Sequence, residues 1–310
     1  NKYSLLHLLL INMHEFPEEY VQDTAFYDEA KKEYVPMSDG AELLHYYTNK
    51  DKDFNIFFVP GFNTGPFSWN DLWSHLYKDY NLYVQEKREM KSAKVKWRHK
   101  ANMDRLALDI KEAIDYFNLD EKKTFLMGPC IGASIIAHTV ATKKVNPLGI
   151  ILNGPPKKFF LPKVLLPLAY VLPAFFMGII GKPLLFIWLT LSMPKGKQRD
   201  IYINNIKNAT GMRWKKFLAV AWHNSFVDYP NVECPALITG ATEDRMHEAV
   251  IAKQVAEMMP KGEYVDTPSY YFAHYNPGAK KYAQITKDFI EKIISTANSV
   301  SYTHLTLPTN

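Results

Sequence analysis

Cysteine is scarce in this chain of 310 residues, which contains only two, Cys130 and Cys234. Two cysteines form at most one bridge, so the dense disulfide framework of small secreted domains is excluded. Because Cys130 lies in a glycine-flanked motif of its own, we do not expect even that one bridge. Cysteine usage therefore favours a reducing compartment, and we expect a cytoplasmic protein.

The chain also has only a small excess of one sign of charge. The chain has 37 Lys and Arg residues against 32 Asp and Glu residues, which gives a formal net charge of +5, and it contains no long basic run. Nucleic-acid-binding domains usually concentrate Lys and Arg on one face or along one helix. We therefore expect no nucleic-acid partner, although the mild positive excess is compatible with docking at an anionic membrane.

Hydrophobic residues, by contrast, are plentiful at 47% of the chain, enough for a substantial core. The length fits one large α/β domain with an insertion, or two ordinary domains. We expect residues 1–33 to form an N-terminal extension, with Met13 as a plausible start and without the cleavage site of a secretory signal. Residues 296–310 are expected to form a tail, which from Ser301 resembles translated sequencing-adaptor read-through.

Short apolar segments alternate with amphipathic ones over residues 34–156 and again over residues 230–295. Residues 54–59 and 148–152 are continuous apolar runs of strand length, whereas residues 104–117 have apolar side chains at helical spacing. Alternation of this kind favours an α/β fold with a mainly parallel sheet and helices on both of its faces.

The alternation is interrupted at residues 157–229. Within this insertion, residues 159–181 contain a single charged side chain and are long enough to span a bilayer. Three prolines interrupt the run: Pro162, Pro167 and Pro173. Because prolines break helices, we predict a helical apolar cap over the site, with a membrane-inserted hairpin as the alternative. An apolar cap implies an apolar acyl pocket and is a candidate for peripheral contact with lipid.

The most informative stretch is Gly128-x-Cys130-x-Gly132, which follows an apolar run of strand length. It has the form of the G-x-S-x-G nucleophile elbow, whose small flanking residues permit a sharp turn from strand to helix and expose the nucleophile. The N-terminus of the following helix favours a negatively charged thiolate. The alternative is that Cys130 is simply a small buried side chain.

A second loop follows the apolar run at residues 54–59 and contains Gly61 and Gly65. In a hydrolase with such an elbow, this loop supplies one N–H group of the oxyanion hole, and the residue after the nucleophile supplies the other. These donors would be the backbone N–H groups of Phe62 and Ile131. The alternative is an ordinary turn between a strand and a helix.

Two further residues complete a catalytic pattern, because Asp244 follows an apolar run at residues 234–240 and His274 lies in the last loop before the C-terminal helix. With this order of nucleophile, acid and histidine, residues 34–294 resemble the α/β-hydrolase superfamily. The resemblance implies an α/β-hydrolase fold with an inserted cap, and a triad of Cys130, Asp244 and His274. Glu243 is the rival acid, because the spacing to Asp244 is one residue longer than in the family.

Two features depart from the family pattern. Residues 86–92 replace the glycine-rich D-x-R-G-x-G-x-S stretch that usually follows the fourth strand, so this loop must take another path. The nucleophile is a cysteine where most members have serine; dienelactone hydrolases and polyhydroxyalkanoate synthases are relatives with cysteine at this position.

The sequence therefore predicts hydrolysis of a carboxylic ester, lactone or thioester of an apolar acyl group through a covalent acyl-enzyme. This reaction needs a small-molecule acyl substrate and neither a metal nor an organic cofactor. One alternative is an acyltransferase of the polyhydroxyalkanoate-synthase type, and another is an inactive hydrolase-like binding protein. The sequence leaves the acyl group and the oligomeric state open.

Overall fold

The computed structural model describes part of the chain. The ranges are residues 21–65, 68–158, 173, 176–192, 199–200, 202–203, 206, 213, 215, 220, 222–244 and 247–305. The expected start at Met13 and much of the predicted cap lie outside these residues, as does most of the apolar run at 159–181.

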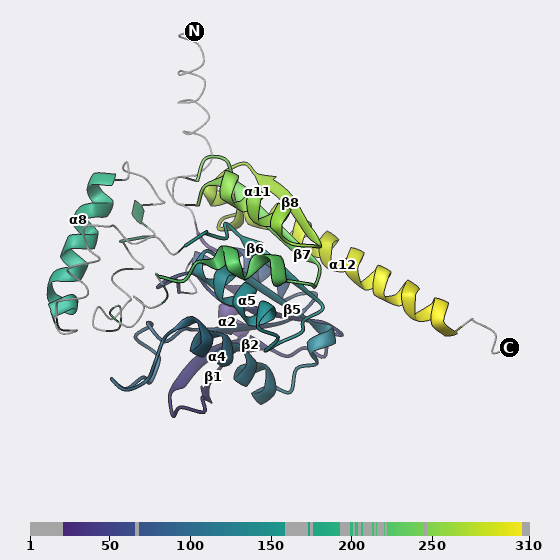
Figure 1. The fold of residues 1–310 in the computed structure, drawn as a ribbon, viewed down its shortest axis with the longest axis horizontal. Helices are drawn as coiled ribbons and strands as arrows, with labels where there is room; N and C mark the ends of the chain where they lie inside the picture. The colour runs from purple at the N-terminus through teal and green to yellow at the C-terminus, as the bar shows by residue number, and fades with distance from the viewer. Residues whose placement is uncertain are drawn as a thin grey trace, which may run out of the picture.

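The centre of the molecule is an eight-stranded sheet with the strand order β1-β2-β4-β3-β5-β6-β7-β8 (Figure 1). β2 is antiparallel to both of its neighbours, and all other pairs are parallel. The strands are β1 (Lys31–Pro36), β2 (Glu42–Thr48), β3 (Asn55–Phe58), β4 (Asn81–Gln85), β5 (Thr124–Pro129), β6 (Gly149–Asn153), β7 (Ala236–Ala241) and β8 (Gly262–Thr267). The predicted fold class is confirmed.

Helices cover both faces of the sheet. They are α2 (Ala25–Glu29), α3 (Asn70–Leu76), α4 (Met103–Tyr116), α5 (Ile131–Ala141), α8 (Lys182–Ser192), α11 (Ala249–Met258) and α12 (Gly278–Leu305). The short helical elements are η2 (Glu121–Lys123), η3 (Met177–Gly181), η4 (Ser225–Val227), η5 (Tyr229–Asn231) and η6 (Tyr270–Ala273).

β3 shows why the central strands are apolar throughout. Phe57 packs into the core that α4, α5 and α11 share, whereas Ile56 and Phe58 pack into the opposite core, with α2, α3 and α12. All three side chains are buried. Because successive side chains of a strand point to opposite faces, a sheet covered on both faces needs apolar residues at every position.

The predicted N-terminal extension differs from the structure at its end. α2 and β1 lie wholly or partly within residues 1–33, and the ring of Phe26 is fully buried, with its centroid 5.6 Å from that of Trp73. A five-residue helix is too short to show a period, and the Lys-Lys-Glu start of β1 is typical of a sheet edge. Phe26 therefore belongs to the core, and β1 belongs to the sheet.

The C-terminal helix also differs from the expectation. The sequence predicts a tail over residues 296–310, but α12 continues to Leu305 and projects from the body of the molecule (Figure 1). Residues 295–305 contain neither glycine nor proline, so nothing in the sequence breaks the helix before Pro308. Within the described part of the chain, none of the helices combines the length and the hydropathy needed to cross a bilayer.

Candidate active site

The turn between β5 and α5 holds Cys130 in an unusual backbone conformation. Its φ is 50° and its ψ is −124°, a region that residues with a Cβ rarely adopt, and it is the N-cap residue of α5. Such strain persists only where the surroundings hold it in place, and it is typical of functional sites. Here the Cys130 N–H donates to the carbonyl of Asn153 at 2.9 Å and ties the turn to the end of β6.

The two elbow glycines are explained by close packing against the end of β3. A Cβ at Gly128 would lie 2.4 Å from the carbonyl oxygen of Val59, and one at Gly132 would lie only 2.1 Å from the same atom. Both contacts are closer than real Cβ atoms allow, so the two positions accept only glycine while the elbow and β3 keep this spacing.

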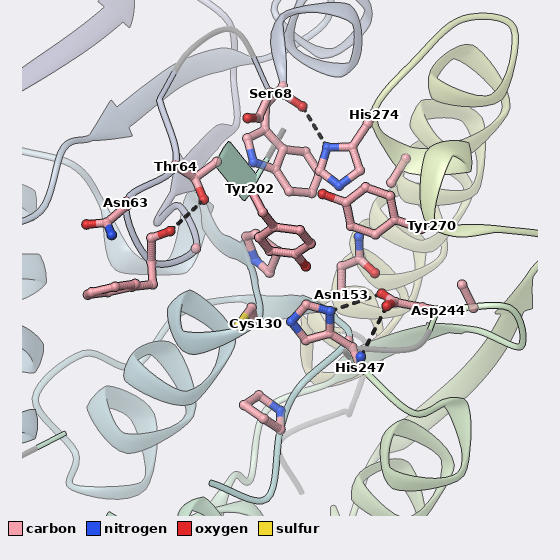
Figure 2. Close-up of a pocket in the computed structure, with 18 of the residues that line it drawn as sticks. Asn63, Thr64, Ser68, Cys130, Asn153, Tyr202, Asp244, His247, Tyr270 and His274 are labelled. Carbon is pink, nitrogen blue, oxygen red and sulfur yellow. Dashed lines mark hydrogen bonds and ion pairs between the residues drawn. The ribbon is translucent and has the colours of Figure 1, made fainter. Parts of the chain in front are cut away.

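A cavity of about 170 Å³ opens in front of Cys130 (Figure 2). The loops that line it follow β3, β5, β6, β7 and β8, because parallel strands end at one edge of a sheet. Apolar side chains from residues 185–206 close another side: Leu185, Trp188, Leu189 and Ile206. The predicted nucleophile, Asp244 and His274 all line this one cavity.

Asp244 forms hydrogen bonds with His247, a histidine that the sequence motifs did not predict as part of the site. Its Oδ2 lies 3.0 Å from Nδ1 of His247, and its Oδ1 accepts the His247 backbone N–H at 3.2 Å. Figure 2 shows the His247 ring between Asp244 and Cys130. With Nδ1 held by the carboxylate, Nε2 is the ring nitrogen left for the thiol. The structure thus brings Cys130, His247 and Asp244 together.

The charges around His247 favour its protonated form. Burial lowers the pKa of His247, but the negative charges of Cys130 and Asp244, together with hydrogen bonds to both, outweigh burial and raise this pKa well above its usual value. A cationic imidazole beside the thiol stabilises a thiolate. A cysteine–histidine pair needs this arrangement of charges for nucleophilic catalysis.

The predicted base, His274, lies in the same cavity but has other contacts. Its Nδ1 donates to the carbonyl of Ser68 at 2.6 Å, and its ring stacks on Tyr270 and packs against Trp69, with centroid distances of 4.6 and 4.0 Å. Burial lowers the pKa of His274 to about 4, so this imidazole is neutral at pH 7. Its contacts hold it away from the carboxylate of Asp244 (Figure 2).

Of the two rival acids, only Asp244 lines the cavity. Asp244 is largely buried, whereas Glu243 is exposed in the turn that precedes it. The second cysteine, Cys234, is buried in the core outside the cavity, where loss of hydration raises its pKa to about 12.

Two residues of the loop between β3 and α3, Gly61 and Phe62, line the cavity. Phe62 is one of the predicted oxyanion donors, and the other, Ile131, opens α5, whose first N–H groups have no acceptor within the helix. The two positions flank Cys130 from separate elements. The Phe62 side chain also packs against Leu189 and Ile206.

The stretch that replaces the family's glycine-rich loop supports this wall through buried charges. Lys87 donates from Nζ to the carbonyl of Gly61 at 2.6 Å and pairs with Glu89 at 2.9 Å. Glu89 Oε1 in turn accepts the N–H of Asn63 at 3.2 Å. Residues 61 and 63, on either side of Phe62, are thus both held by side chains of this loop.

No model of a known protein family and no curated protein sequence matches this chain. Solved structures do match it. An esterase from Thermogutta terrifontis superposes with a TM-score of 0.70 and 16% sequence identity, over 85% of this chain and 99% of its own. An enol-lactonase from Burkholderia xenovorans LB400 gives a TM-score of 0.64 and 14% identity, over 84% of this chain and all (100%) of its own.

A third match is a membrane phospholipase A, with a TM-score of 0.65 and 12% identity, over 94% of this chain and 98% of that one. These similarities, together with the strand order and the strained elbow residue, decide the fold. The chain has the α/β-hydrolase fold. In this fold, Cys130 lies at the turn between β5 and α5, the position for which the sequence predicts the nucleophile.

A signal for His247 is present in the sequence. Asp244-x-x-His247 places a histidine three residues after the predicted acid, at the same end of the same strand. The resemblance to the family pointed instead to the last loop, where His274 lies. A search for every histidine near a strand end would have identified both.

Proposed function

We propose that this α/β-hydrolase cleaves carboxylic esters or lactones of small apolar acyl groups, with Cys130 as its nucleophile. The observation that carries the proposal is the strained Cys130 at the elbow, with His247 and Asp244 directly beside it. Esterase and lactonase structures of the same fold support the reaction class. The apolar wall formed by Leu185, Leu189 and Ile206 supports the substrate class.

The proposed reaction has two halves. In the first, the Cys130 thiolate forms a bond to the carbonyl carbon, and the Phe62 and Ile131 N–H groups stabilise the oxyanion. The bond to the alcohol oxygen then breaks, and that oxygen takes the proton from Nε2 of His247. In the second half, water attacks the thioester and gives a proton to His247, after which the carboxylic acid leaves and Cys130 is again a thiolate.

Asp244 has two functions in this scheme. It holds the His247 ring in the orientation that directs Nε2 to the thiol, and its charge stabilises the imidazolium. His274 is the competing base, because it occupies the position that the family resemblance implies. The contacts favour His247: this histidine reaches both Cys130 and Asp244, whereas His274 is held by Ser68.

The experiment measures release of p-nitrophenolate from butyrate and octanoate esters by the full-length chain. Cys130→Ala should abolish release, and intact mass spectrometry of the wild type should detect an acylated Cys130 in the burst phase. Equal activity in the wild type and Cys130→Ala would overturn the proposal. Consumption of ester with transfer of the acyl group to an added alcohol, and no free acid, would indicate an acyltransferase instead.

Substitution of the two histidines distinguishes the competing bases. His247→Gln should lower kcat by roughly 10²- to 10⁴-fold, the usual contribution of a general acid–base. His274→Gln should lower it much less, and His75→Gln, on α3, is the matched control. The reverse order of His247 and His274 would assign the base to His274. Asp244→Asn should lower kcat strongly, whereas Glu243→Gln should leave it unchanged.

We also propose that α8 contacts lipid. Its exposed side chains include Phe186, Ile187 and Leu191, the last with 82% of its surface accessible, and the positive net charge suits an anionic bilayer. The matched membrane phospholipase supports the idea only by its fold. Co-sedimentation with phosphatidylserine vesicles should be lost in Leu191→Asp. A wild-type protein that stays in the supernatant would overturn the proposal.

A further inference from the structure

A second cluster of chemically active side chains lies away from the cavity. His138 on α5 and His223 and Asp228 near η4 place three ligand atoms within 4.8 Å of one another. None of the three residues lines the cavity. We propose that these three side chains bind one zinc ion, which fastens the segment before β7 to the helix that begins after Cys130. This inference is independent of the proposed function.

The three side chains of the cluster are close enough to reach a single small cation. Nδ1 of His138 lies 3.1 Å from Oδ1 of Asp228, and Nε2 of His223 lies 2.5 Å from Oδ2 of the same carboxylate. Ligands of a tetrahedral zinc ion are about 2.0–2.2 Å from the metal, which separates neighbouring ligand atoms by roughly 3.3 Å. The 3.1 Å separation is near this value, whereas the 2.5 Å separation, to the other carboxylate oxygen, is that of a direct hydrogen bond that zinc would replace.

Asp104 provides an independent feature of a metal site. Its Oδ1 lies 3.1 Å from Nε2 of His138, on the side of the ring that faces away from the cluster. A carboxylate at this position accepts the Nε2 proton and leaves the lone pair of Nδ1 directed at the metal. Metal-binding histidines commonly have such a partner, which fixes the tautomer and the orientation of the ring.

The types of ligand favour zinc over the hard cations. Calcium and magnesium prefer oxygen ligands, whereas two imidazoles and one carboxylate form a common zinc-binding set. A water molecule would complete the tetrahedron. His138 and Asp228 are only 8% and 6% exposed, so a bound ion would be largely buried, and the Asp228 carboxylate would offset one of its two positive charges.

The position of the cluster indicates a structural function. His138 belongs to α5, Asp104 to α4, and His223 and Asp228 to the segment by which the chain returns to the sheet at β7. A metal ion would cross-link α5 to this segment, and Asp104 would connect α4 to the site through His138. We therefore expect zinc to stabilise the folded chain, without any part in the chemistry at Cys130.

The test uses the full-length chain with Cys130→Ala, because a thiol beside His247 could itself bind zinc. Protein stripped with a chelator is dialysed against micromolar zinc, and bound metal is measured by plasma mass spectrometry together with the melting temperature. The expected result is one zinc ion per chain and a melting temperature that rises with zinc concentration.

Variants in the same background identify the ligands. His223→Gln and Asp228→Asn should lose the bound zinc and the zinc-dependent rise in melting temperature. Asp104→Asn should weaken zinc affinity by roughly 10- to 100-fold, the usual effect of removing a partner of a ligand. His75→Gln should behave like the parent. Zinc binding that is absent, or that survives both ligand substitutions, would overturn the proposal and leave a network of ion pairs.

Discussion

Lys87 and Glu89 form an ion pair of 2.9 Å whose side chains are only 2% and 0% exposed, next to the loop that carries Phe62. The pair occupies the stretch where the sequence departs from the family pattern. Its two ends hold the backbone of Gly61 and Asn63. The family pattern has a glycine-rich loop here, whereas in this chain buried charges position the loop.

Removal of one partner of this pair should destabilise the protein strongly. Lys87→Met leaves the buried Glu89 carboxylate without its ion-pair partner, a change that typically costs about 3–5 kcal/mol of unfolding free energy. Urea denaturation followed by circular dichroism measures this loss. Lys94→Met is the matched control, because Lys94 pairs with Glu42 on the surface, and it should change stability by less than about 1 kcal/mol. Similar losses in both variants would contradict a special role for the buried pair.

Gly132→Ala should displace the elbow from β3. The new Cβ would lie 2.1 Å from the carbonyl oxygen of Val59 and 2.8 Å from that of Pro60, and both atoms belong to the backbone. Since neither can rotate away, we expect a loss of at least about 2 kcal/mol in unfolding free energy. Ser134→Ala, on the same helix, removes only a hydroxyl group. A Gly132→Ala protein as stable as Ser134→Ala would refute the packing argument.

The pKa values of the two cavity histidines should be shifted in opposite directions from that of a free imidazole. Burial holds the pKa of His274 at about 4, whereas the charges beside His247 raise its pKa well above 6.5. Imidazole resonances followed by NMR between pH 5 and 8 should therefore show His274 neutral throughout and His247 protonated at neutral pH. A His274 resonance that titrates near pH 6.5 would show that this ring is not held as the structure describes.

The low pKa of His274 also affects stability. The unfolded chain takes up this proton near pH 6.5, whereas the folded chain takes it up only near pH 4. The folded state therefore loses stability as the pH falls from 6.5 to 4, by roughly 3 kcal/mol for this group. His274→Gln should remove that part of the acid dependence in urea denaturation measured across this range.

Alkylation should separate the two cysteines. Iodoacetamide at pH 7.5 should modify Cys130, which lines the cavity beside a cationic imidazole, and leave Cys234, whose pKa burial raises to about 12. Peptide mass mapping after limited reaction measures the two sites. His247→Gln should slow the modification of Cys130, because the thiolate loses its cationic partner. Equal labelling of both cysteines in the folded protein would contradict this assignment.

Much of the fold could be predicted because the central strands are buried on both faces. Continuous apolar runs such as that of β3 can satisfy both cores only in a covered sheet, and the alternation with helices fixes their parallel order. The elements that escaped prediction are those with weak local patterns. α2 is one turn and a half long, and β1 begins with three charged residues, so both depend on contacts such as that between Phe26 and Trp73.

The sequence by itself determined that Cys130 stands in a glycine-flanked turn and that Asp244 follows the strand after the insertion, because short motifs and strand ends are local features. Only the tertiary structure showed which histidine lies beside Cys130 and Asp244. His247 reaches the thiol because β5 and β7 end at the same edge of the sheet, while the carbonyl of Ser68, 206 residues away in the chain, holds His274. The contacts of His247 with Cys130 and of His274 with Ser68 depend on packing between distant segments, which no local pattern records.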